Sequence, residues 1–245
     1  MKAESVPLVF LHALGADGTC WDEIVTRLPD FTVITMDLPG HGKRPLTSSA
    51  LSLQEISDLV IHQVHLMGFD RVHVAGMSLG GLIAQDLAER EPNFVDHVVL
   101  IDTVPTYPEF VRQQWRERAE IARTRGMADL LEPTLATWFT ADALAAQIPT
   151  ITRFTEVFLS TNPEGYAQTC ELLAEVDIEA HLPTIAAPTL IVCGQDDLPP
   201  FINAVPTFTS QIPGSRSSWI DPGRHAAALE SPDAFVSLLR DFLSS

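Results

Sequence analysis

The chain has 245 residues, of which 46% are hydrophobic and 19% charged, which is the balance of an ordinary folded protein and excludes a disordered one. Its formal net charge of −17 argues against a nucleic-acid partner, because the phosphates would be repelled. No apolar run approaches the roughly 20 residues of a membrane-spanning helix, so no membrane partner is expected. The chain opens without a signal-peptide pattern, and its three cysteines form no CxxC pair, so we expect a cytoplasmic protein with reduced thiols.

The first hundred residues alternate between strand-like and helix-like segments. Ser52 and Glu55 fit a capping box, which marks the start of one helix. Because the strand-like segments are apolar throughout, the alternation predicts a mostly parallel sheet with helices on both faces. The expected strands are residues 6–11, 31–38, 71–77 and 97–101, and the expected helices are residues 21–28, 52–67 and 79–90.

The middle of the chain has a different character, since no strand-like run interrupts its helical segments. The expected helices there are residues 110–125, 127–139, 141–147, 152–159 and 163–176. The alternation then resumes with strands 189–193 and 217–220 and helices 200–210 and 226–242. We therefore predict an α/β core (residues 1–104 and 182–245) and a helical cap (residues 105–181) inserted after the strand of residues 97–101, lying over a site that the sheet builds.

One motif carries nucleophile chemistry. Residues 76–80 read Gly-Met-Ser-Leu-Gly, the pattern G-x-S-x-G of a serine on a strained turn between a strand and a helix. The expected strand and helix flank it on the correct sides. The glycines are needed because side chains two residues from Ser78 would collide in such a turn. We predict that Ser78 is a nucleophile.

A serine hydroxyl needs a base that takes its proton during attack. His225 follows the last expected strand and lies on a loop at a helix start, so it is our candidate base. The acid that would orient it should follow an earlier strand. Asp196 and Asp197 both follow the strand that stops at Gly194, spacing alone cannot separate them, and Asp221 is a third candidate.

The oxyanion that forms during such an attack needs two backbone donors. The amide of Leu79 begins the helix after the turn and is expected to provide one. Topology predicts the other in the loop after the first strand, with Leu14 as the candidate.

These landmarks resemble the α/β-hydrolase superfamily along the whole chain, and the resemblance implies the α/β-hydrolase fold. In relatives the acid is usually the third residue after the strand-ending glycine, which favours Asp197 over Asp196. The matching segments are residues 11–15 (LHALG), 36–42 (MDLPGHG), 76–81 (GMSLGG) and 225–232 (HAAALESP).

Within the superfamily, the cap is most similar to 3-oxoadipate enol-lactonases, on residues 125–130 (RGMADL), 138–140 (WFT) and 162–167 (NPEGYA). The resemblance implies hydrolysis of a small carboxylated enol-lactone by Ser78, His225 and Asp197, with no cofactor and no metal. Trp138 is a candidate for substrate binding, and a cap arginine (Arg112, Arg116, Arg123 or Arg153) could bind the substrate carboxylate. The alternatives are a small-ester carboxylesterase, a C–C bond hydrolase, or a ligand receptor or signalling protein with little turnover.

Two departures from the family pattern stand out. Ala13 occupies a position where relatives usually carry glycine or serine. Family members also commonly begin with a β-hairpin that this chain lacks, so the strand of residues 31–38 should form the edge of the sheet and present unpaired amides. We expect this edge to be covered by the N-terminal residues or by a second subunit, which would make the protein a homodimer.

Overall fold

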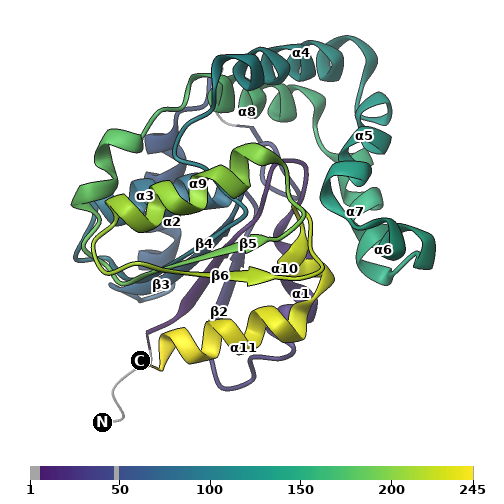
Figure 1. Ribbon diagram of the computed structural model, residues 1–245. Helices are drawn as coiled ribbons and strands as arrows, with labels where there is room; N and C mark the ends of the chain where they lie inside the picture. The colour runs from purple at the N-terminus through teal and green to yellow at the C-terminus, as the bar shows by residue number, and fades with distance from the viewer. Residues whose placement is uncertain (1–5, 47–49, 245) are drawn as a thin grey trace.

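The computed structural model describes residues 6–46 and 50–244 (Figure 1). Its centre is a six-stranded sheet in the order β2-β1-β3-β4-β5-β6, in which each neighbouring pair is parallel. The expected fold class is thereby confirmed. The strands are β1 (Leu8–Leu11), β2 (Val33–Met36), β3 (Val72–Met77), β4 (Val95–Ile101), β5 (Thr189–Gly194) and β6 (Arg216–Ile220).

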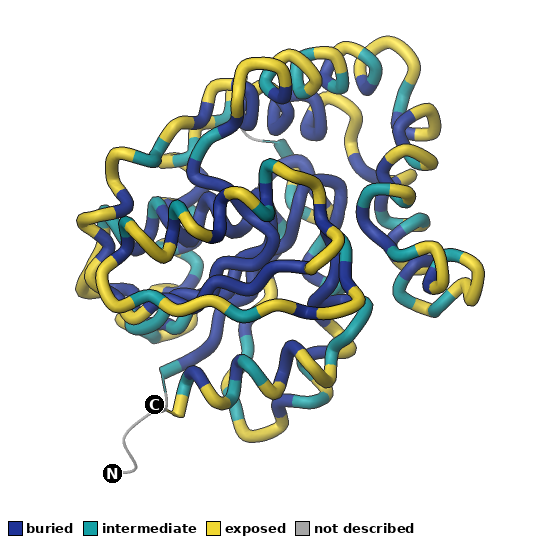
Figure 2. Tube along the Cα trace, viewed as in Figure 1, coloured by how far each residue is buried: buried dark blue, intermediate teal, exposed yellow. Residues whose placement is uncertain are grey.

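Helices cover both faces of the sheet. The helices α1 (Asp22–Val25) and α11 (Pro232–Leu243) lie on one face, and α2 (Leu53–Leu66), α3 (Leu79–Arg90) and α9 (Pro199–Gln211) lie on the other (Figure 1). The strands are buried almost throughout, and the helices expose only their outer sides (Figure 2). Because parallel strands all end at one edge of the sheet, the loops after β1, β3, β4, β5 and β6 collect there.

Five helices between β4 and β5 pack over that edge, and we call them the cap (Figure 1). Their bounds are α4 (Glu109–Arg125), α5 (Ala128–Trp138), α6 (Ala141–Ala146), α7 (Pro149–Ser160) and α8 (Pro163–Glu175). The cap touches the core where Gly165 at the start of α8 meets Gly40. A Cβ atom on Gly40 would lie 2.6 Å from the Cα of Gly165, so neither position has room for a side chain.

The C-terminal helix expected at residues 226–242 is wrong as a single element. The structure has a short helix α10 (Ala227–Glu230), a break at Ser231 and then α11. The break falls there because Pro232 has no amide hydrogen and disfavours helical backbone angles in the residue before it, and Ser231 has φ −125° and ψ 65°.

Two other elements also differ from expectation. The helix expected at residues 21–28 is a 3-10 turn (Gly18–Trp21) followed by the single turn α1, and a second 3-10 segment (Glu179–Thr184) was not expected. Strand β2 is an edge strand, as expected, with β1 as its neighbour among the described residues. Residues 1–5, which were expected to help cover this edge, lie outside the described residues. No helix in the described ranges is both long and apolar enough to cross a membrane.

Candidate active site

Ser78 lies on the tight turn between β3 and α3 and is only 5% exposed. Its backbone has φ 54° and ψ −111°, a strained conformation for a residue with a side chain. The two motif glycines make the turn possible. A Cβ atom on Gly76 would lie 2.0 Å from the carbonyl oxygen of Gly80, and one on Gly80 would lie 2.2 Å from the carbonyl oxygen of Leu11.

Neighbouring strand β4 anchors this turn. The amide of Ser78 donates to the carbonyl of Ile101 at 2.9 Å, and the hydroxyl of Thr103 donates to the carbonyl of Ser78 at 2.7 Å. These bonds offset part of the strain, because they hold the backbone of Ser78 in its unusual conformation.

His225 and Asp197 face each other at the same edge of the sheet. Nδ1 of His225 lies 3.0 Å from Oδ2 of Asp197, and both side chains are almost completely buried. The amide of Leu198 donates to the other carboxylate oxygen at 2.6 Å. Asp196 and Asp221 are exposed, so of the three candidate acids it is Asp197 that meets the imidazole.

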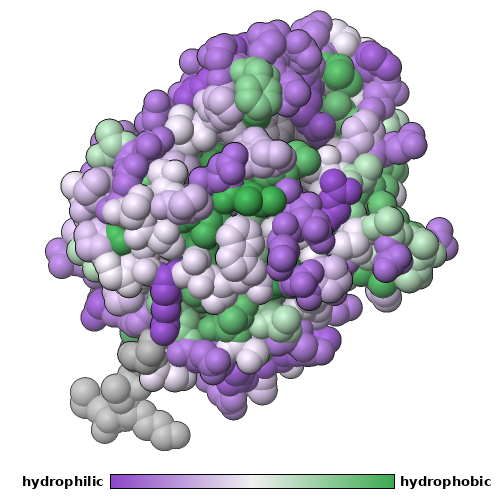
Figure 3. Space-filling model, in the orientation of Figure 1, coloured by the Kyte–Doolittle hydropathy of each residue, from purple (hydrophilic) through white to green (hydrophobic). Residues whose placement is uncertain are grey.

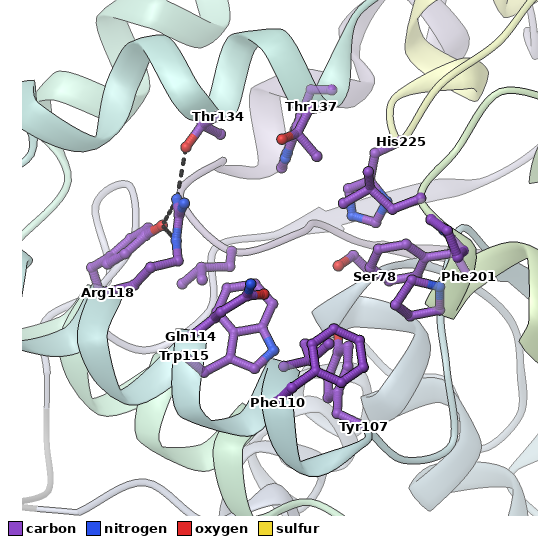
Figure 4. A pocket seen from close by; sticks show the side chains of 17 residues that line it. Ser78, Tyr107, Phe110, Gln114, Trp115, Arg118, Thr134, Thr137, Phe201 and His225 are labelled. Carbon is purple, nitrogen blue, oxygen red and sulfur yellow. Dashed lines mark hydrogen bonds between the residues drawn. The ribbon is translucent and has the colours of Figure 1, made fainter.

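A cavity of about 370 Å³ under the cap is lined by Ser78 and His225 (Figure 4). Ser78 and His225 lie together at one end of it, beside Phe201, whose ring centroid is 4.2 Å from that of His225. Trp138 from α5 is also in the lining, and its ring meets the ring of His225 at 5.7 Å. Hydrophobic residues gather between the cap and the core on the face drawn in Figure 3, with hydrophilic residues around them.

Of the two candidate oxyanion donors, Leu79 directly follows the nucleophile and Leu14 lines the same cavity. Leu79 is the first residue of α3, where a helix leaves its amide without an intrahelical partner. The loop that carries Leu14 is braced by His12. The amide of Leu38 donates to Nε2 of His12 at 2.9 Å, so Nδ1 carries the hydrogen and donates to the carbonyl of Ala13 at 2.8 Å.

This bracing requires a neutral ring. Burial is the main cause that lowers the pKa of His12 to about 4, and burial followed by the neighbouring His12 lowers the pKa of His41 to about 3. The ring centroids of the two histidines are 5.3 Å apart. Both rings therefore act as uncharged structural supports under the cavity at neutral pH.

The opposite end of the cavity holds an arginine that our sequence analysis missed. Arg118 on α4 donates to the hydroxyls of Tyr166 at 2.6 Å and Thr134 at 2.7 Å (Figure 4). Among the described residues, no carboxylate lies within ion-pair distance of its guanidinium group. Its charge is thus held by neutral groups alone. Arg118 lies three residues after Trp115 and seven after Val111, on the face of α4 that lines the cavity, but the sequence does not show which face of the helix that is.

The four arginines that the sequence suggested are engaged elsewhere. Arg112 donates to the backbone carbonyls of Tyr107, Ala174 and Val176. The other three are bound near the surface: Arg116 pairs with Glu109 and Glu175, Arg123 pairs with Glu164 and Glu171, and Arg153 donates to Thr19. None of the four is in the lining of the cavity that contains Ser78.

One group of possible metal ligands lies at the far end of the sheet. The Nδ1 atoms of His73 and His97 are 3.4 and 2.9 Å from the same carboxylate oxygen of Asp96, whose other oxygen pairs with Arg71. Since this carboxylate already pairs with Arg71 and bonds to His97, we assign no metal to the group.

Comparison with known proteins agrees with this fold. The model of the alpha/beta hydrolase family matches residues 8–238, so the chain belongs to that family. The chain is 28% identical to 3-oxoadipate enol-lactonase 1 of Acinetobacter baylyi, over 99% of this chain and 90% of that protein. It is 30% identical to a pimeloyl-[acyl-carrier protein] methyl ester esterase of Aromatoleum aromaticum, over 96% of each.

A solved structure gives the same picture. The enol-lactonase of Burkholderia xenovorans LB400 superposes with a TM-score of 0.93 at 29% identity, covering 100% of this chain and 94% of that one. The resemblance to the superfamily and to its enol-lactonases is therefore confirmed. Relatives of this chain are hydrolases, and they include both lactonases and esterases.

Proposed function

We propose that the protein is a serine hydrolase that opens a small carboxylated enol-lactone through an acyl-enzyme on Ser78. The observation that carries this proposal is that Ser78 and His225 line one cavity while Nδ1 of His225 lies 3.0 Å from Asp197. In the first step Nε2 of His225 takes the proton of Ser78 while the hydroxyl oxygen attacks the lactone carbonyl. Asp197 holds the imidazole in the required tautomer and stabilises its positive charge.

The amides of Leu79 and Leu14 would bind the oxyanion of the tetrahedral intermediate. Collapse of that intermediate breaks the ring C–O bond, and the enol oxygen leaves with the proton that His225 carries. Water then attacks the acyl-enzyme with His225 again as base, which releases the carboxylic acid and restores Ser78.

Arg118 supports a substrate that carries a negative charge. A guanidinium group held only by neutral hydroxyls at the end of a mostly apolar cavity can pair with a carboxylate through Nη1, because the hydrogens of Nη2 and Nε already go to Tyr166 and Thr134. The lactone carbonyl would then lie at Ser78 and the carboxylate at Arg118. The enol-lactonases of Acinetobacter baylyi and Burkholderia xenovorans LB400 among the relatives support this choice.

A second candidate is a carboxylesterase for small esters, and the methyl ester esterases among the relatives favour it. The same residues would serve, since an ester and a lactone present the same carbonyl to the nucleophile. A linear ester with a distant carboxylate would also satisfy Arg118. The two reactions differ in their products: a lactone gives one molecule that carries both the acid and the former leaving oxygen, whereas an ester gives an acid and a separate alcohol.

The test is activity profiling of the wild type and Ser78→Ala. The substrates are a carboxylated enol-lactone, an enol-lactone without the carboxylate, and p-nitrophenyl esters of short acids. We expect the carboxylated lactone to give the highest kcat/KM and Ser78→Ala to lose turnover with all substrates. Rapid hydrolysis of short esters with no lactone turnover would replace the lactonase by the esterase. Binding of the lactone with negligible product release would indicate a receptor.

A further inference from the structure

A second buried acid lies behind Asp197. Asp102 directly follows β4, is 1% exposed and has φ 44°, one of the few positive φ values among the described residues other than glycine. Aspartate tolerates this conformation better than most residues. Its Oδ1 accepts a hydrogen bond from the amide of Gly194 at 2.7 Å. Asp102 thereby holds the end of β5, three residues before Asp197.

The other carboxylate oxygen of Asp102, Oδ2, differs from Oδ1 in its hydrogen bonding. Oδ2 is buried and has no hydrogen-bond partner within the described structure. Carboxylate oxygens of Asp102 and Asp197 and Sγ of Cys193 all lie within 4.8 Å of one another. An ionised carboxylate oxygen that is buried without a donor is costly, so this environment favours a protonated acid.

The partners of the two acids decide which one carries the proton. Asp197 receives hydrogen bonds from His225 and from the amide of Leu198, and both stabilise its charge. Asp102 receives one backbone hydrogen bond, from the amide of Gly194, lies beside the thiol of Cys193, and takes part in no ion pair among the described residues. Burial, and then the charge of Asp197, raise the pKa of Asp102 well above its usual range.

We propose that Asp102 is a positioning residue that stays protonated at neutral pH and donates a hydrogen bond from Oδ2 to the carboxylate of Asp197. The inference rests on the proposed roles of Asp197 and His225 and adds to them. The two acids then share one negative charge. His225 experiences that single charge, and the carboxylate that orients it is itself fixed by a donor from β4.

Infrared spectroscopy tests the protonation state without any substrate. We expect a difference spectrum between the wild type and Asp102→Asn at pH 7 to show loss of the C=O stretch of a buried carboxylic acid. Asp96→Asn is the matched control, because Asp96 lies near the other end of β4 and pairs with Arg71. The proposal would be overturned if the wild type shows no carboxylic acid band, or if the band persists in Asp102→Asn.

Kinetics on a p-nitrophenyl ester test the positioning role. We expect kcat/KM to fall at acid pH because His225 must be neutral to act as base, and we call this fall the acid limb. Asparagine can keep both bonds, accepting from Gly194 and donating to Asp197. We therefore expect Asp102→Asn to retain most of kcat with the acid limb in place, and Asp102→Ala to lose about tenfold in kcat with little change in KM.

An ionised Asp102 would behave differently. Asp102→Asn would then remove a negative charge near His225 and move the acid limb to lower pH by about one unit, which would contradict the proposal. If Asp102→Ala does not fold, the infrared band and the acid limb of Asp102→Asn still decide. If no ester or lactone is hydrolysed, the proposed function fails, while the infrared measurement still decides the protonation of Asp102.

Discussion

The ring of Trp138 meets the ring of His225 edge to face, with centroids 5.7 Å apart. The backbone repeats this contact, because the carbonyl of Trp138 accepts from the amide of Ala226 at 2.9 Å. Beside it, the carboxylate of Glu230 in α10 accepts hydrogen bonds from the amide and hydroxyl of Thr140 in the cap. The candidate base is therefore held by the cap as well as by the core, and the proposed function then predicts that the cap affects catalysis as well as enclosing the substrate.

This contact predicts that shortening Trp138 affects the chemical step. We expect Trp138→Ala to lower kcat about tenfold because His225 loses a restraint, and Trp138→Phe to lower it less because a ring edge remains. Trp115→Ala is the comparison, since Trp115 lines the same cavity from α4. It should raise KM more than it lowers kcat. Steady-state kinetics on folded variants, checked by circular dichroism, measure both. Equal loss of kcat in the two alanine variants would argue against a specific restraint on His225.

The two neighbouring aspartates should differ sharply in their effect on rate. Asp197→Asn removes the charge that stabilises the imidazolium and can impose the wrong tautomer on His225, so kcat should fall by about 10³–10⁴. Asp196→Asn changes an exposed side chain and should alter kcat less than about twofold. Single-turnover and steady-state rates of both variants provide the measurement. A large loss in Asp196→Asn with little loss in Asp197→Asn would reverse our choice of acid.

Arg118 should set the preference for charged substrates. Arg118→Gln is expected to lower kcat/KM for the carboxylated lactone by about 10- to 100-fold, the cost of losing a charge-assisted hydrogen bond. Hydrolysis of a neutral ester should change little. Arg116→Gln is the matched control, because Arg116 lies on the same helix but pairs with Glu109 and Glu175 at the surface. If Arg118→Gln impaired charged and neutral substrates equally, Arg118 would have a structural role in the cavity wall.

The buried histidines predict a loss of stability in mild acid. His12 has a pKa of about 4 in the folded protein and about 6.5 in the unfolded chain, so below pH 6.5 the unfolded state binds more protons and the free energy of unfolding falls. His41, with a pKa of about 3, acts in the same direction. Each should remove up to about 1.4 kcal/mol per pH unit below that point.

Urea unfolding between pH 5.5 and 7.5 measures this effect, at pH values above the sequence pI of about 4.6. His12→Gln replaces the ring by a side chain that does not titrate. The free energy of unfolding of this variant should therefore change less with pH than that of the wild type, by an amount that corresponds to about one proton. His62→Gln is the control, since His62 lies on the surface side of α2. An identical pH dependence in the wild type and His12→Gln would show that the pKa of His12 is the same in the folded protein as in the unfolded chain, which would contradict the lowering by burial.

The edge strand β2 gives a prediction about assembly. Thr35 is exposed at this edge, and we propose that a second copy of the chain pairs with β2. Sedimentation equilibrium should then give a dimer, and hydrogen exchange should show slow exchange for the β2 amides that point away from β1. A monomer with rapid exchange at those amides would mean that this short edge simply faces water.

The sequence predicted the sheet and the catalytic candidates because both depend on local patterns. Apolar strands followed by helices define a parallel sheet, and the glycines around Ser78 admit only one kind of turn. The choice between Asp196 and Asp197 needed the family resemblance. Adjacent residues lie almost equally far along the chain from the strand, and they differ in the direction in which their side chains point. The structure supplies the direction: one side chain is exposed and the other meets His225.

Arg118 could not be singled out in the same way. Helix α4 contains five arginines, and composition does not say which of them faces the cavity. That depends on how α4 lies on α8 and on the core, a matter of packing between segments far apart in the chain. Asp102 escaped notice for a similar reason, since its importance comes from Gly194 and Asp197, more than ninety residues later.

The meeting of Gly40 and Gly165 bears on which molecules fit. Tyr166, the residue after Gly165, holds Arg118 at the far end of the cavity, whereas Ser78 is fixed by the sheet. A methyl group on either glycine would push α8 away from the core and move the guanidinium group of Arg118 away from the nucleophile. The distance that a substrate needs between its reacting carbonyl and its charged group thus depends on the absence of a side chain at both glycines.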